Sequence, residues 1–357
     1  MIPSSLRSWF WPALALGAGA LFFLDSGEAS AGVARGMDLC VQSVIPALFP
    51  YMVISSLLLS QPKAAALLSL PLRPLGRLMG QKDPHFSTVL LLCLLGGFAS
   101  AAHCIRLSLE SGRISRRQAW LLCFCGIYAS PAFVCNVAGA ALGAGAGPLL
   151  LGCGLGAGFF CCLAAPRLCP LRENPALPSL PAGRALQKNP GQSPSQAIGS
   201  AALAMVQICG FVIFFSFLAG VFGALLPQIP AARALLGSAL EMTGGCEACL
   251  GLPGPLPFYG CRAALSLLGL CAFCQVDALL PAGLSRRPVF LGRLLHTGLS
   301  LAFLRVLLPF LPQSAPAYSS LAPRLYTYHR MEPDAALVLF LLCCLVLFRL
   351  EKSSRSA

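Results

Sequence analysis

A few ionisable side chains stand inside stretches that are otherwise apolar. Arg262 is the only charged residue in residues 255–276, and Glu241 lies in a mostly apolar segment with Thr243 close by. Ionisable residues at membrane depth are functional candidates, because an unpaired charge there is costly. An arginine could grip a carboxylate through two parallel hydrogen bonds or neutralise a nearby acid, and a glutamate could carry a proton or a cation. The chemistry indicated is reversible binding of a solute or ion. The alternatives are that Arg262 snorkels to the interface and that Glu241 is an interfacial acid on a surface helix.

Further polar candidates lie at or near the ends of such stretches. Ser100 and His103 could donate hydrogen bonds, and His103 could also titrate near neutral pH. Arg293 and His296 share one face of a helix, and Gln275 can both donate and accept. For all five, a solvated or interfacial position at the end of a span is the alternative interpretation.

The stretch around His103 recurs in altered form in the second half of the chain. Residues 95–103 and 268–276 are both apolar, break at small residues, carry a polar side chain at or near the end and lead into a basic turn. Glycine-interrupted apolar segments at matching places in two halves point to the binding site of a transporter. Gly96 and Gly97 would let backbone amides face an anion from a broken helix end. Close helix packing through small residues is the alternative.

The composition is that of a membrane protein. The chain has 357 residues, of which 57% are hydrophobic and 10% charged, whereas a soluble domain carries roughly 25% charge. Several apolar runs approach or exceed the ~20 residues that a helix needs to cross a bilayer. The net charge of +13 comes from Lys and Arg in short loops, which is the positive-inside pattern and not a nucleic-acid-binding surface. We expect an all-α polytopic membrane protein.

The 18 cysteines predict neither disulfides nor a metal site. Many lie inside apolar runs, where a free thiol behaves as a small hydrophobic group. Two CxxC pairs, Cys246 with Cys249 and Cys271 with Cys274, lie in apolar, Gly-rich surroundings without histidine partners. The sequence also contains no nucleotide-binding loop and no nucleophile–base–acid set. We therefore expect no metal, no cofactor and no enzymatic activity.

The apolar runs and basic stretches divide the chain into five parts. The first ends in an acidic loop and begins with an apolar run, residues 9–24, for which we favour a retained helix over a removed signal peptide. A proline-rich basic linker separates two similar halves. The five parts are residues 1–35, the first repeat 36–166, the linker 167–196, the second repeat 197–312 and a C-terminal helix and tail, 313–357.

Charge placement predicts re-entrant hairpins. Residues 86–104 could cross the membrane, but the loops on both sides are basic, so the segment would have to enter and return, turning near Gly96 and Gly97. Residues 255–276 are the second candidate hairpin. Counting crossings makes the two halves inverted relative to each other. Arg286 and Arg287 fall on the wrong side in this count.

Two proline-containing stretches complete the pattern. Residues 61–85 mix apolar and basic residues, which predicts a segment lying on the membrane surface. Ser130 precedes Pro131, which breaks a helix in mid-run and could bring Ser130 to a cavity. A plain proline kink is the alternative.

Six short motifs follow one another in order between about residues 36 and 310: residues 96–103, 112–115, 129–133, 241–245, 269–276 and 293–296. This ordered set resembles the YlbJ-type sporulation integral membrane proteins, also called stage V sporulation protein V, of the nucleoside recognition or gate-domain group. The family has proline, glycine and lysine where this chain has Ala99, Ala101 and His103, and asparagine where it has Ser130.

The resemblance implies movement of dipicolinic acid across the outer forespore membrane during sporulation. A dicarboxylate site would mix neutral donors with few cations, so that the solute can be released again. The expected partners are a small anionic solute and the lipid bilayer, with proton or cation coupling if His103 or Glu241 takes part. A non-transporting scaffold of a sporulation complex and a nucleoside-type carrier are the alternatives.

Overall fold

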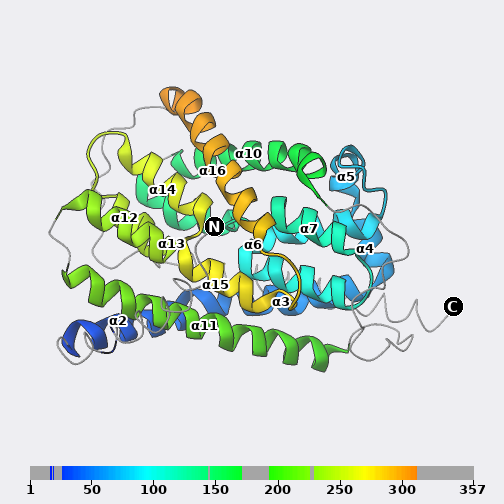
Figure 1. Ribbon diagram of the computed structural model, residues 1–357, viewed down its shortest axis with the longest axis horizontal. Helices are drawn as coiled ribbons and strands as arrows, with labels where there is room; N and C mark the ends of the chain where they lie inside the picture. Colours follow the sequence, from blue (N-terminus) through cyan, green and yellow to red (C-terminus); the bar gives the residue numbers. More distant parts are fainter. Residues whose placement is uncertain are drawn as a thin grey trace, which may run out of the picture. The chain divides into compact units, whose positions relative to one another are not determined.

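The computed structural model describes residues 26–143, 145–170, 193–225 and 229–311, together with Gly17 and Gly19. The expected helix at residues 9–24, most of the linker 167–196 and the C-terminal part 313–357 lie outside these ranges. Every regular element within them is a helix (Figure 1). This confirms the all-α fold class.

Six of the helical segments in the described ranges are long and apolar enough to cross a membrane, as expected for an integral membrane protein. Each contains an apolar stretch with few charged residues, which suits a lipid surrounding. They are Ala29–Ser60, Pro84–Glu110, Ala146–Leu168, Pro194–Gly223, Leu256–Leu279 and Arg287–Phe310.

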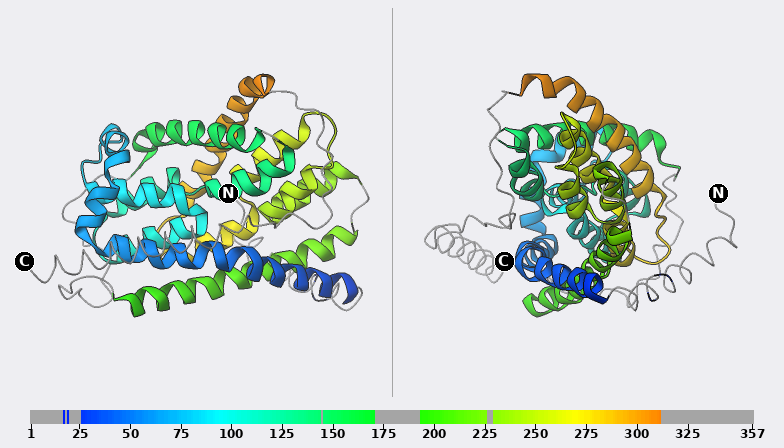
Figure 2. Two further views of the ribbon diagram at one scale, coloured as in Figure 1. Left: turned by 180° about the vertical axis from the view of Figure 1, so that it is seen from behind. Right: turned by 90° about the vertical axis from the view of Figure 1, so that its left-hand side faces the viewer.

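The first of these spans begins inside the stretch that was expected to be an acidic loop. α2 (Ser26–Leu39) is helical and continues through a π-helical turn, Cys40–Val44, into α3 (Ile45–Ser60). α2 lies beside α11 (Pro194–Leu225) in every view (Figures 1 and 2). A Cβ added at Gly36 would come within 2.7 Å of the Cα of Ile213. The loop prediction is wrong because small residues let these two helices pack backbone to backbone.

Three short helices follow α3. They are α4 (Pro62–Leu68), a 3-10 turn at Leu70–Leu72 and α5 (Arg73–Leu78). Large apolar side chains on them are exposed: Leu67, Leu70 and Leu78. Exposed leucines beside basic residues fit the membrane-surface segment expected for residues 61–85.

α6 (Pro84–Glu110) folds back on itself at Gly97, whose φ is +81°. The Nε2 of His85 lies 3.2 Å from the Oγ of Ser108, 23 residues later. A straight α-helix would separate these residues by about 34 Å. Only a residue without a Cβ adopts this backbone conformation readily, so the chain turns where the glycine pair predicts.

The second half also contains a fold-back, but at Glu241. α12 (Pro230–Leu240) and α13 (Met242–Cys249) pack against each other on either side of it. A Cβ at Gly245 would lie 2.5 Å from the Cα of Ser238, a contact that a continuous helix does not permit.

The hairpin expected at residues 255–276 is instead a broken helix. α14 (Leu256–Leu267) and α15 (Gly269–Leu279) meet at Leu268, which has a φ of +71°. α14 packs against α13 and α16 (Arg287–Leu307), whereas α15 packs against α6 and α11. The prediction is wrong because α14 and α15 do not pack along each other: most of their contacts are with different helices, although both also touch α12 and α13.

The two halves of the chain share one order of elements. A long helix (α3; α11) is followed by a fold-back (α6; α12 with α13), a broken helix and a closing helix (α10; α16). The first broken helix runs from α7 (Arg116–Cys125) through the non-helical residues 127–130 to α8 (Pro131–Phe133), a π-helical turn at Val134–Gly139 and α9 (Ala140–Leu142). α10 is Ala146–Leu168. Equivalent helices pack together, α3 with α11 and α10 with α16.

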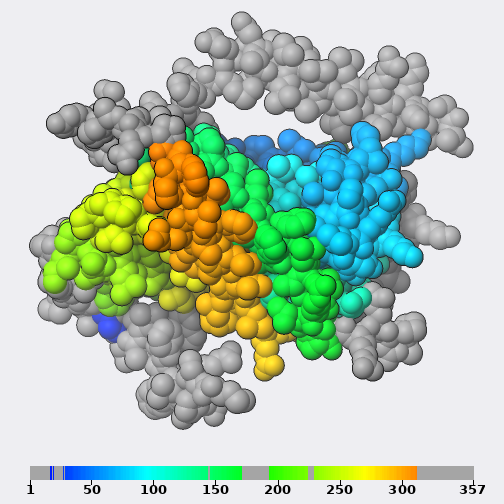
Figure 3. Space-filling view, turned by 90° about the horizontal axis from the view of Figure 1, so that it is seen from above, coloured from blue at the N-terminus to red at the C-terminus, as the bar shows by residue number. Residues whose placement is uncertain are grey.

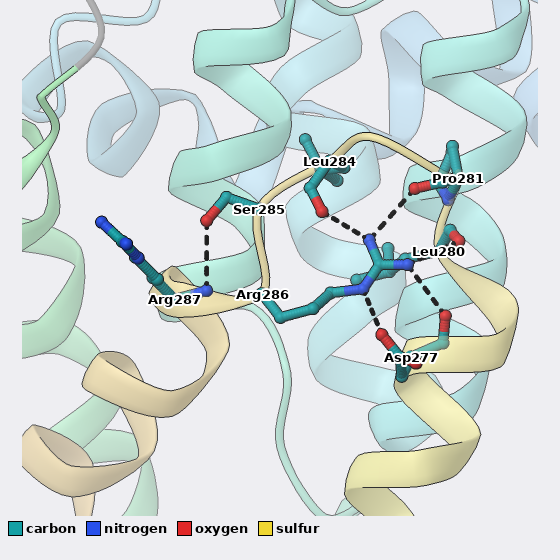
Figure 4. A network of polar contacts seen from close by, with 7 residues as sticks. All are labelled: Asp277, Leu280, Pro281, Leu284, Ser285, Arg286 and Arg287. Carbon is teal, nitrogen blue, oxygen red and sulfur yellow. Dashed lines mark hydrogen bonds and ion pairs between the residues drawn. The ribbon is translucent and has the colours of Figure 1, made fainter. Parts of the chain in front are cut away.

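Arg286 fastens the turn between α15 and α16 (Figure 4). Its Nε donates to the carboxylate of Asp277 at 2.6 Å, and its Nη2 donates to the Asp277 and Leu280 carbonyls. Its Nη1 donates to the Pro281 and Leu284 carbonyls. Arg286 therefore stabilises the turn between α15 and α16. This structural role explains why a cation occupies a loop that the predicted topology places on the side where few cations are expected.

Candidate functional site

Arg262, Arg293 and His296 are buried close together, with exposed fractions of 3%, 2% and 2%. Arg262 comes from α14, and the other two come from α16. The His296 ring packs 4.9 Å from the Tyr128 ring, and the guanidinium carbon of Arg293 lies 4.6 Å from the centre of that ring. We call Tyr128, Arg262, Arg293 and His296 the buried cation cluster.

Arg262 is fully engaged in structural hydrogen bonds. Its Nη1 donates to the Leu150 carbonyl of α10 at 2.7 Å, and its Nε and Nη2 donate to the Ser266 hydroxyl at 3.2 and 2.9 Å. Ser266 in turn lies 2.9 Å from the hydroxyl of Ser300 on α16. Arg262 thus ties α14 to α10 and α16. It makes no contact with Glu241, the acid it was expected to be able to neutralise.

Arg293 lies against the Tyr128 phenol but has no well-formed hydrogen bond to any described residue. Its Nε, Nη1 and Nη2 are all buried without an acceptor in the part of the chain that the structure describes, and neither Arg293 nor Arg262 forms an ion pair there. The Tyr128 Oη and the His296 Nδ1 are likewise buried without a partner. Buried polar groups in proteins nearly always have partners, so this arrangement fits an anion that accepts from several donors at once.

Two glycines of α10 make room for the cluster. A Cβ at Gly154 would lie 2.9 Å from the Arg262 Nη1, and one at Gly158 would lie 2.8 Å from the Tyr128 Oη. The Gly154 carbonyl also lies 3.1 Å from the Nε2 of His296. The sequence pattern did not single out Gly154 and Gly158, whereas Tyr128 belongs to the proline-interrupted stretch, residues 128–131, that was expected to break a helix and line a cavity. The alternation of glycines along residues 152–158 was the available signal for the first two.

The tip of α6 meets the non-helical segment that carries Tyr128. A Cβ at Gly97 would lie 3.2 Å from the backbone nitrogen and the Cβ of Ser130. Ser130 caps α8 by accepting the N–H of Phe133 at 3.3 Å. The structure therefore brings Gly97 and Ser130 together, two residues after Tyr128, while the neighbouring Gly96 packs against the Tyr51 ring.

The second arm of α6 carries a separate polar group. His103 is fully buried, with its Nε2 3.2 Å from the Ser56 hydroxyl and its Nδ1 3.3 Å from an Arg106 nitrogen. The Ser100 hydroxyl is buried without a partner. Among the described residues, the hydrogen-bond partners of His103 are Ser56 and Arg106, and the polar candidates of the two halves therefore have separate partners.

The third polar group surrounds the fold-back between α12 and α13. The Glu241 carboxylate accepts the N–H groups of Thr243 at 2.9 Å and Gly244 at 2.8 Å, which caps α13. Burial raises the pKa of Glu241, and these two donors oppose that rise. A Cβ at Gly269 would lie 3.2 Å from the Glu241 nitrogen. The second fold-back therefore meets the second helix break, just as Gly97 meets Ser130 in the first half.

Gln275 lies on α15 and is buried. Its Nε2 donates to the Cys271 sulfur at 3.2 Å, and its Oε1 has no partner within the described ranges. The cysteines described by the structure are free thiols. No group of three or more His, Cys, Asp or Glu side chains with metal-binding geometry is found among the described residues.

No known protein family matches this chain, and no curated protein or solved structure is similar to it. The resemblance drawn from the six motifs therefore stays a prediction, and the buried cation cluster is the feature of the structure that bears on function.

Proposed function

We propose that this protein is a membrane transporter of a small carboxylate. Dipicolinic acid is the first candidate solute, because the motif resemblance implies it. The observation that carries the proposal is the guanidinium of Arg293, which is buried between apolar spans without an acceptor.

The unpartnered atoms of the cluster favour an anion with several acceptor oxygens. A buried cation without a counter-charge costs several kcal/mol. A carboxylate could accept two parallel hydrogen bonds from Arg293 and a further one from the Tyr128 hydroxyl. The His296 Nε2 donates to the Gly154 carbonyl, so the Nδ1 of the neutral ring is an acceptor and could take a hydrogen bond from a protonated carboxyl group of the solute. Because Arg262 is already satisfied by protein groups, one free guanidinium remains, which limits the binding strength and permits release.

The repeated order of elements supports a transport cycle. In each half a fold-back touches a helix break, Gly97 against Ser130 and Glu241 against Gly269. Interrupted helices at matching places are typical of secondary transporters with inverted halves. We propose that α6 and the α12–α13 pair are re-entrant hairpins, that the halves are inverted, and that they move relative to each other during alternating access. A location in the outer forespore membrane rests on the resemblance alone.

The test is uptake of radiolabelled dipicolinate into proteoliposomes, with and without an imposed pH gradient. We expect saturable uptake by the natural protein and loss of uptake in Arg293→Gln. Arg287→Gln is the matched control, because Arg287 is an exposed arginine on the same helix. Folded protein without uptake of dipicolinate or any other small carboxylate would refute the proposal, and so would full uptake by Arg293→Gln. Uptake that follows the pH gradient would establish proton coupling.

A further inference from the structure

A cavity of 120 Å³ opens where α5 joins α6, at the surface formed by the segment that follows α3 (Figure 3, light blue). It is far in sequence from the buried cation cluster, and it serves none of the roles proposed above. Three of its lining residues are cationic. The lining consists of Arg73, Arg77, Gln81, Lys82, Pro84 and Ser87.

The charge of this cavity is positive and largely uncompensated. Arg73 is held in place by its hydrogen bonds to the Ser69 hydroxyl at 2.8 Å and the Ala66 carbonyl at 3.2 Å. Arg77 and Lys82 are exposed, and neither forms an ion pair with another described residue. The neighbouring acid, Asp83, does not line the cavity.

Asp83 is occupied at the start of α6. Its carboxylate accepts the N–H of His85 at 2.9 Å and so caps that helix. The fixed guanidinium of Arg73 and the two free cations therefore face the cavity without a carboxylate among the lining residues.

The side-chain amide of Gln81 adds a hydrogen-bond donor to the cavity. The side chain is 4% exposed, and its Nε2 is buried without a hydrogen-bond partner in the described part of the chain. An unmade hydrogen bond of a buried donor costs about 1–3 kcal/mol. A ligand with acceptor oxygens in the cavity would remove this cost while also meeting the three cations.

The surroundings indicate where such a ligand comes from. Leu67, Leu70 and Leu78 are exposed on the same short helices, with exposed fractions of 67%, 51% and 61%. Apolar side chains beside cations are typical of segments that lie among lipid headgroups. Basic pockets at this level bind the phosphates of anionic lipids. We propose that this cavity binds a phosphate group, with an anionic membrane lipid as its source.

The test measures lipid binding to the full chain in neutral detergent by native mass spectrometry. Phosphatidylglycerol, phosphatidylcholine and inorganic phosphate are titrated separately, and phosphate is also added as a competitor of the lipid. We expect one saturable phosphatidylglycerol site and weaker binding of phosphatidylcholine. The double variant Arg77→Gln, Lys82→Gln should bind phosphatidylglycerol about 30-fold more weakly, since each cation near an anionic lipid surface contributes a roughly fivefold effect.

Two further variants keep the test decisive. Arg116→Gln with Arg287→Gln removes the same charge from exposed positions outside the cavity and should leave binding unchanged. Gln81→Leu keeps the charge but removes the unpartnered donor, and should weaken binding several-fold. Inorganic phosphate that displaces the lipid would show that the cavity also takes free phosphate. Equal losses in the two double variants would overturn the proposal, as would unchanged binding in the cavity variants.

Discussion

Replacing Arg293 with methionine is expected to stabilise the ligand-free protein, whereas the same replacement at Arg262 is expected to destabilise it. The two arginines are buried to the same degree, at 2% and 3% exposure. They differ in partners: Arg262 donates to Leu150 and Ser266, and Arg293 donates to none of the described residues. The pair therefore separates a structural arginine from a ligand-binding one.

The magnitudes follow from these contacts. An unpaired buried ion costs several kcal/mol, and the contact of Arg293 with the Tyr128 ring returns about 2 kcal/mol. Removal of Arg293 should therefore stabilise the folded state by roughly 1–3 kcal/mol, taking the difference of these two effects. Removal of Arg262 also relieves the cost of a buried ion, but it breaks the hydrogen bonds of a charged donor to Leu150 and Ser266, at about 1.5–3 kcal/mol each, so the folded state should lose roughly 1–3 kcal/mol.

The assay is thermal unfolding in detergent, followed by circular dichroism, with and without dipicolinate. The natural protein should unfold at a higher temperature when dipicolinate is present, because a ligand stabilises the state that binds it. Arg293→Met should start from a higher midpoint and show no shift with ligand. Arg262→Met should start from a lower midpoint.

Two results would refute this reasoning. If Arg293→Met unfolded as early as Arg262→Met, Arg293 would be part of the structural network and not a free ligand group. If Arg293→Met kept the full dipicolinate shift, the carboxylate would bind elsewhere.

Three further predictions test other contacts. Gly158→Ala should weaken dipicolinate binding at least tenfold in the thermal-shift titration, because its Cβ would lie 2.8 Å from the Tyr128 Oη. A Cβ at Gly152 on the same helix would have no atom within 4 Å, so Gly152→Ala should bind dipicolinate normally. Equal loss of binding in both variants would contradict the prediction for Gly158→Ala. Arg286→Gln should lower the free energy of unfolding by about 1–3 kcal/mol, because it breaks the turn between α15 and α16. The control variant Arg287→Gln, at the exposed neighbouring position, should change the free energy of unfolding by no more than about 0.5 kcal/mol. An unchanged free energy of unfolding in Arg286→Gln would contradict the stabilising role of Arg286 in this turn. Stability should fall as the pH rises from about 4.5 through the raised pKa of Glu241, since burial disfavours its charged form. Melting curves of Glu241→Gln should lack this step, whereas Glu247→Gln, changed at an exposed position of α13, should keep it.

The features that depend on local composition could be predicted from the sequence. In lipid, the backbone N–H and C=O groups of a long apolar run must form hydrogen bonds within the chain, and a helix provides them. The long uncharged runs therefore predicted an all-α membrane protein. The turn of α6 at Gly97 was also predictable, because a glycine pair in an apolar run is a place where the backbone can adopt a positive φ. The spacing of Arg293 and His296 placed both on one helix face, and they are indeed buried together.

The features that depend on packing could not be predicted. Residues 255–276 have as strong a hairpin pattern as residues 86–104, yet the fold-back of the second half is at Glu241. The acidic composition of the stretch before α3 predicts a loop, but Gly32 and Gly36 let this stretch pack as a helix on α11. In both places the outcome depends on which neighbouring helix is available, which local pattern does not encode.

The chain's own sequence thus determined that it is a helical membrane protein with a few polar groups inside its spans. Only the tertiary structure decided which of those groups is free to bind. In the sequence, Arg262 stands inside an apolar stretch and Arg293 near the start of one, and neither position says which arginine is free. Arg262 donates to the Leu150 carbonyl, 112 residues away, whereas the Arg293 guanidinium lies over the face of the Tyr128 ring and its nitrogens lack a well-formed hydrogen bond to a described residue. Hydrogen-bond satisfaction is a property of the packed fold, since the partners of a buried group come from distant parts of the chain.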